Sequence, residues 1–158
     1  MDLNDWILSL HVLSAFALVG AEVIFTLMIV ALWNTDNPAR VVAFMPLSRV
    51  GAVLVMAGIA GTIVFGVWLA ISLDAYQVWD GWVIAAIVLW AVAVELGRRA
   101  GKLYGGAGME AERLSAAGTE TSPVVAETFG ASRAVQFHAA SSLLVLLILI
   151  DMIWKPGA

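Results

Sequence analysis

The chain has 158 residues, of which 62% are hydrophobic and 13% are charged. Soluble domains carry about 25% charged residues, so this composition excludes a soluble globular protein. The net charge of −4 excludes the basic surface that nucleic-acid binding requires. The absence of cysteine excludes disulfides, thiolate metal sites and cysteine nucleophiles.

Four apolar runs reach the length of about 18 residues that marks a transmembrane helix. They predict an all-α fold, an antiparallel four-transmembrane-helix bundle that forms a single membrane domain. The first run is too long for the apolar core of a signal peptide and lacks its basic start, so we expect it to remain as a helix. The predicted spans are about 6–33, 46–73, 78–97 and 134–154.

The first two spans are separated by the turn-forming sequence NTDNPAR. The segment 98–133, between the third and fourth spans, combines charged residues with many Gly, Ser and Thr. Within it, MEAERLSAAG has a helix-forming composition, and Ser122 followed by Pro123 predicts the start of a short helix. We therefore expect a loop that contains short helices.

Lysine and arginine predict the orientation, because cytoplasmic loops are enriched in both. Lys155 is the one basic residue expected on the side of the two termini. The first and third loops, with their flanks, hold the other seven: Arg40, Arg49, Arg98, Arg99, Lys102, Arg113 and Arg133. This asymmetry predicts that these loops are cytoplasmic and that both termini lie outside.

Small residues recur along one face of the second span. Gly58, Thr62 and Gly66 are spaced by four, and Gly61 belongs to a parallel row. Transmembrane helices associate through close packing of small residues rather than through the hydrophobic effect. We therefore expect Gly58, Gly61 and Gly66 to pack against the first helix, its neighbour in the chain.

Two groups of charged residues have helical spacing at the ends of spans. Glu95 precedes Arg98 by three residues and Arg99 by four, and Asp151 precedes Lys155 by four. Side chains at these spacings meet on a helix surface. Both groups are interpreted as ion pairs at the membrane interface.

His11 and Glu22 are ionisable residues inside the first apolar run. Eleven residues turn a helix by about 1100°, which leaves the two side chains about 20° apart on one face and about 16 Å apart along the axis. Glu22 is expected near the midplane, without a basic residue one turn away. One interpretation is a neutral acid bonded to the second helix near Thr62, and the other is a proton, ion or ligand site.

His138 is expected near the cytoplasmic start of the fourth helix, at the other end of the membrane from His11. The two histidines are then about 20 Å apart or more, so they do not both bind one haem iron or copper ion within a subunit. Each is either a hydrogen-bonded membrane histidine or a cofactor-binding residue. As a cofactor site, one histidine would hold haem b or copper with a different second ligand, or across a dimer.

The chain resembles a bacterial family of four-helix predicted integral membrane proteins of unknown function. The stretches that carry the resemblance are LHVLSAFALVGAEVIF, GIAGTIVFGVWLA and LLILIDMIWKPG, with His11, Gly20, Gly61, Gly66, Lys155 and Pro156 at the matching positions. More distantly, the layout is similar to CopD-type copper-resistance membrane domains and to HemJ-type protoporphyrinogen oxidase. The HemJ type carries His and Lys in its third helix, and GWVIAAIVLWAVAVELG has neither. The resemblance implies a bacterial inner (plasma) membrane.

The sequence leaves three functions open. The scarcity of convergent polar groups favours a non-enzymatic accessory or scaffold subunit. Such a subunit would contact membrane lipids and pack in a homo-oligomer or against other membrane subunits. The alternatives are a haem- or copper-binding redox protein that uses His11, and a small transporter or proton path that uses Glu22.

Overall fold

The computed structural model describes residues 2–72, 77 and 79–155. Its helices are α1 (Leu3–Ala31), α2 (Pro38–Ser72), α3 (Gly81–Ala116), α4 (Pro123–Phe129) and α5 (Arg133–Trp154). Four helical segments are long and apolar enough to cross a membrane. The prediction of an all-α, four-helix membrane bundle is confirmed. The link 73–76, the predicted span limits at 73 and 78 and the closing Pro156 lie outside the described residues.

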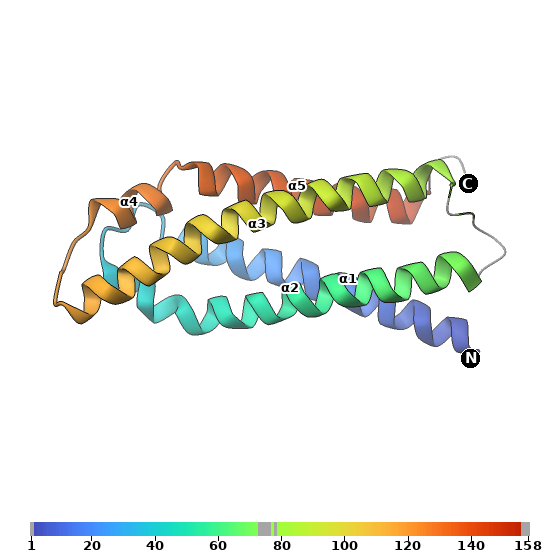
Figure 1. Ribbon diagram of the computed structural model, residues 1–158, viewed down its shortest axis with the longest axis horizontal. Coiled ribbons are helices and arrows are strands. Elements are labelled where there is room, and N and C mark those ends of the chain that lie inside the picture. The colour runs from blue at the N-terminus through green and yellow to red at the C-terminus, as the bar shows by residue number, and fades with distance from the viewer. Residues whose placement is uncertain (1, 73–76, 78, 156–158) are drawn as a thin grey trace.

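The four long helices run side by side along the long axis of the molecule (Figure 1). The start of α1 and the end of α5 lie at one end, and α4 lies at the other (Figure 1). The most extensive interfaces join α1 to α2 and α3 to α5, while α2 and α3 connect these two pairs. The α1–α5 interface is much smaller.

The α1–α2 interface is built from α2 glycines that face larger side chains of α1. A Cβ atom at Gly58 would lie 2.6 Å from Leu18 Cγ, and one at Gly66 would lie 2.9 Å from His11 Cε1. Gly51 faces Phe25 and Gly61 faces Ser14 in the same way. These α1 positions, 11, 14, 18 and 25, follow the 3.5-residue period of a left-handed coiled coil. The antiparallel pair therefore keeps one register over nearly the whole of α1.

Replacing Gly58 with Ala is expected to lower the free energy of unfolding in detergent by about 1–3 kcal/mol, because the added methyl group overpacks the interface. The backbone oxygen of Ser14 lies 2.9 Å from the new Cβ atom and restricts relaxation. Gly105→Ala is the matched control, since a Cβ atom there meets nothing within 4 Å. The control should keep or raise stability, because alanine favours helix. Equal melting of both variants would show that Gly58 does not lie in a tight contact.

The α3–α5 interface uses small residues of α3. Ala86, Ala93 and Ala100 are spaced by seven residues and are each at most 5% exposed, and a Cβ atom at Gly97 would lie 3.3 Å from Ser141 Oγ. The Ser141 hydroxyl of α5 donates a hydrogen bond to the Ala93 carbonyl oxygen at 3.0 Å. A polar side chain bonds a neighbouring backbone in this way only where the two helices approach closely.

The helices α2 and α3 are longer than the predicted spans. The prediction places the start of the second span at Pro46, but α2 begins at Pro38 and carries Pro46 inside it. The prediction ends the third span near 97, but α3 continues to Ala116 and includes MEAERLSA, most of the predicted helix-forming stretch. The helix formers of this stretch extend α3, since no proline interrupts it. The short helix predicted at Ser122 and Pro123 is confirmed as α4, with Ser122 as its N-cap.

The extensions of the helices form a region that we call the lobe, residues 28–48 and 100–133. It has a hydrophobic core of its own, composed of Leu32, Val41, Ala107, Ala111, Val125 and Phe129. The backbone of Ser122 donates to the Asp36 carbonyl oxygen at 2.7 Å, and that of Asn34 donates to the Phe129 carbonyl oxygen at 3.2 Å. These bonds hold α4 against the connection between α1 and α2.

The ion pairs predicted at Glu95 are confirmed. Its carboxylate accepts from the Arg98 guanidinium at 2.8 Å and from the Arg99 guanidinium at 2.7 Å. At the end of α5, the Lys155 ammonium lies 5.5 Å from the centre of a Trp82 ring. The exposed ion pairs of Glu95 contribute little to stability. They are informative because they show where along α3 the uncharged stretch ends.

Candidate functional site

Two polar pairs face each other between α1 and α5. Glu22 and Thr26 are four residues apart on α1, and His138 and Ser142 are four residues apart on α5. This spacing places both members of each pair on one helix face, one turn apart. Since α1 and α5 run antiparallel, Glu22 lies opposite Ser142 and Thr26 lies opposite His138.

The four side chains form one connected group. The Ser142 hydroxyl donates to Glu22 Oε2 at 2.5 Å, a distance typical of a hydroxyl bound to a carboxylate. Thr26 Oγ1 lies 2.9 Å from His138 Nε2. His138 Nδ1 lies 3.6 Å from Glu22 Oε2, which is too long for a hydrogen bond and is an ion pair only when His138 is protonated. The side chains of His138 and Glu22 are 13% and 23% exposed, so little solvent would separate them.

The hydroxyl groups allow the histidine and the carboxylate to change protonation without losing their partners. A threonine hydroxyl can donate or accept a hydrogen bond. Thr26 can therefore donate to Nε2 of a neutral His138 and accept from Nε2 of a protonated His138. Ser142 has the His138 carbonyl oxygen as a second acceptor at 3.0 Å. The site therefore accommodates one proton more or less with small movements of two hydroxyl groups.

The expected bond between Glu22 and Thr62 does not occur in the described structure. The Thr62 hydroxyl donates to its own helix, at 2.7 Å from the Gly58 carbonyl oxygen. In the 3.5-residue period of the α1–α2 interface, Glu22 falls about 50° from the direction of His11, at the edge of that interface rather than within it. There the Ser142 hydroxyl of α5 reaches its carboxylate.

His11 lies in a different environment from Glu22. Its ring packs on Gly66, and its Nδ1 atom is buried without a hydrogen-bond partner among the described residues. Along α1 it is fifteen residues, or about 22 Å, from the Thr26 that contacts His138. The structure thus brings Glu22 and His138 together and leaves His11 apart. In the described part of the chain, no group of three or more His, Asp or Glu side chains is placed to hold a metal ion.

Sequence reasoning missed Thr26 and Ser142. The available signal was the repeated spacing: an acid followed four residues later by threonine in one apolar helix, and a histidine followed four residues later by serine in another. Hydroxyl residues are common at membrane helix contacts, so each alone is uninformative. The matching spacing of the two pairs is what fits an antiparallel contact.

Comparisons with known proteins indicate no function, so the functional argument rests on this geometry. The resemblance to the four-helix family stays a prediction, as does a haem b or copper site at His11 or His138. No protein-family model, curated protein or solved structure matches the chain.

Proposed function

We propose that this integral membrane protein binds and releases a proton within the bilayer, and that Glu22 and His138 share it. The observation that carries the proposal is the 3.6 Å contact between His138 Nδ1 and Glu22 Oε2. Ionisable residues within membrane helices are costly, and they mark ion pathways and proton relays unusually often. Here an acid and a base from different helices meet, and each also contacts a hydroxyl group.

At this distance, a proton on either group changes the electrostatic energy of the other. With no proton to share, a carboxylate faces a neutral imidazole and the pair carries one negative charge. With one proton, the pair is neutral overall, as an imidazolium beside a carboxylate or as a neutral imidazole beside a carboxylic acid. Apolar surroundings penalise net charge, so proton binding and release change the electrostatic energy of the α1–α5 contact.

An accessory role in a larger membrane complex is the second candidate. Two hollows on the described surface lie away from the pair. One is in the lobe, between 36–39 and 115–121, and the other is on the outer surface of α1 between Leu8 and Phe16. Neither of these two hollows contains a residue of the proton pair, which suits a subunit that works with other membrane subunits or with a second copy.

The proposed location is a bacterial inner membrane, with the lobe in the cytoplasm and both termini outside. The basic residues support this orientation, since seven of the eight lie at or beyond the lobe side of the apolar segments. The labelling experiment described below tests it.

Histidine NMR in lipid nanodiscs tests the proton site. The chain has two histidines, so His11 serves as an internal reference for His138. Glu22→Gln should displace the titration of His138 and leave that of His11 in place, and proton uptake should fall by about one proton per chain. Glu110→Gln, in the lobe, is the control that should change neither histidine. An unchanged His138 titration in Glu22→Gln would refute a shared proton.

A further inference from the structure

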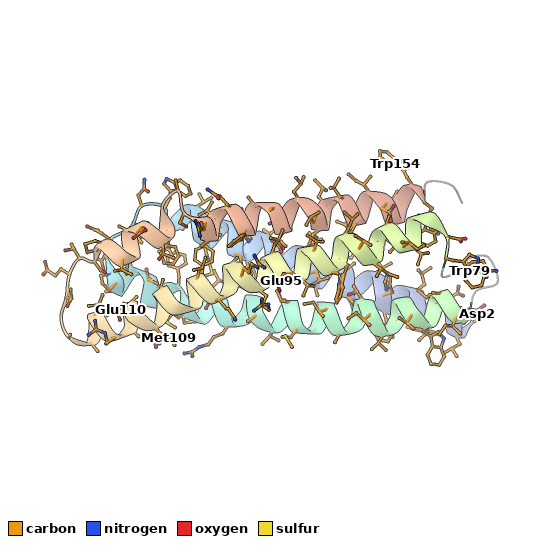
Figure 2. All side chains as sticks on the ribbon, turned by 45° about the horizontal axis from the view of Figure 1, so that its top comes forward. Asp2, Trp79, Glu95, Met109, Glu110 and Trp154 are labelled. Carbon is orange, nitrogen blue, oxygen red and sulfur yellow. The ribbon has the colours of Figure 1, made fainter. Side chains whose placement is uncertain are left out.

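The two longest helices exceed the thickness of a bilayer. The helix α2 has 35 residues and α3 has 36, which correspond to about 52 and 54 Å. The hydrocarbon core of a bilayer is about 30 Å thick. Roughly 20 Å of each helix therefore extends beyond it. Figure 2 shows Glu95 far from both ends, between the end that carries Trp79 and Trp154 and the end that carries Glu110.

Charged side chains mark the level at which the apolar part ends. Helix α2 carries no charge from Val50 to Ser72, and α5 carries none between Arg133 and Asp151. On α3, the uncharged stretch ends at Glu95, Arg98 and Arg99. From Arg49, Arg99 and Arg133 to the other end of each helix is about 27–35 Å. Arg49 and Arg99 place one boundary of the hydrocarbon core at the same level, the level of Phe137, over which Arg99 lies. Arg133 lies four residues, or about 6 Å, beyond that level.

The burial of apolar side chains changes at this level. The largest fully buried side chains, Leu32, Pro38 and Val125, all lie in the lobe. In the apolar part, Leu13, Val53 and Ile71 are 64%, 68% and 76% exposed. Water drives apolar side chains into a core, whereas lipid does not. The lobe is therefore packed like a protein in water, and the rest is packed like a protein in lipid.

Contacts between the helices place the proton pair at and just inside this boundary. His138 follows Phe137, over which Arg99 lies, so it lies at the level of the boundary itself. Because Gly51 faces Phe25, Arg49 lies opposite Leu27, and Glu22 is five residues, or about 7.5 Å, further in. The opposite boundary is then about 22 Å away.

We infer that Glu22 and His138 exchange their proton with water on the lobe side only, and that the lobe stands in that water. The inference rests on the proposed proton site and adds the side from which it is reached. The charged groups at its level are Arg49 of α2 and, on α3, Glu95 with Arg98 and Arg99, which are paired with each other. Arg99 also lies over the ring of Phe137, 5.9 Å from its centre. The boundary thus carries polar groups next to the pair.

Single cysteines test the boundary, since the chain contains none of its own. Leu103, Met109, Val88 and Val92 are all exposed on α3, at 44%, 67%, 56% and 46%. In nanodiscs, a water-soluble maleimide should label Leu103→Cys and Met109→Cys completely, because it reacts with the thiolate in water. Labelling of Val88→Cys and Val92→Cys should be lost. In intact cells, the two lobe cysteines should react only after the cells are opened.

Sealed liposomes test the side of exchange. After a pH step in the outer solution only, the fraction of His138 that titrates should equal the fraction of chains whose Leu103→Cys is labelled from outside. The inference would be overturned if the titrating fraction of His138 instead matched the fraction of chains labelled at Trp154→Cys, at the opposite end. It would also be overturned if His138 titrated in every chain. If His138 does not titrate together with Glu22 on either side, the proposed proton site fails, while the cysteine labelling still decides the boundary.

Discussion

Replacing Glu22 with Leu is expected to lower the free energy of unfolding by about 3 kcal/mol, although leucine is the more lipid-soluble residue. The change removes the carboxylate that faces the His138 imidazole at 3.6 Å, so a protonated His138 would be left without a counter-charge in apolar surroundings. Ser142 keeps the His138 carbonyl oxygen as an acceptor, so most of the cost comes from the histidine. The α1–α5 contact, which is small elsewhere, should weaken most.

Two further variants separate loss of the pair from a change in shape. Glu22→Gln keeps an acceptor oxygen for Ser142 and the length of the side chain, so it should cost much less than Glu22→Leu. Val23→Leu alters the next residue, which is 52% exposed, and should leave stability unchanged. Thermal and denaturant unfolding in one detergent measures all three. Equal stability of the leucine and glutamine variants at position 22 would show that the polar pair does not hold α1 and α5 together.

Replacing Leu32 with Ala is expected to lower the free energy of unfolding by about 3 kcal/mol, within the range for a buried leucine that leaves a cavity. Leu32 is fully buried in the lobe core, beside Val125 and Phe129. The loss combines the transfer of apolar surface into water with a cavity that closely packed neighbours cannot fill. The lobe should therefore lose its fixed packing before the apolar part does.

Leu27→Ala is the matched control on the same helix. Leu27 is 61% exposed, so its truncation leaves no cavity and only reduces the side-chain surface in contact with detergent. Its effect on stability should be a small fraction of that of Leu32→Ala. If the two substitutions cost the same, the lobe core would not be the main site of hydrophobic stabilisation.

The fold class could be predicted from the sequence because four apolar runs leave few alternatives in lipid, where every backbone group must be bonded within a helix. The α2 glycines predicted a helix contact because close approach of two helices requires small residues. The prediction named α1 because it is the nearest helix in the chain. The length of α3 was not predictable from hydropathy, since a helix continues across the membrane boundary wherever helix formers follow.

The partner of Glu22 depended on a finer quantity than composition. In the heptad of the α1–α2 interface, Glu22 lies at the edge of the contact, from which its side chain can reach either α2 or another helix. Chain order favoured α2, yet the partner is Ser142 of α5, 120 residues away in the sequence. The Glu22–His138 contact therefore required the arrangement of the helices in space.

The constant register of α1 and α2 limits where the chain tolerates insertions and deletions. From Asn4, which accepts from Ser72, to Phe25, which faces Gly51, each step along one helix is matched by a step along the other. One residue added within either stretch would turn everything beyond it by about 100°. Every glycine contact past that point would be lost at once. Insertions are expected to be tolerated better in the connection 117–121, whose residues are mostly exposed, because a change of length there shifts no contact between the long helices.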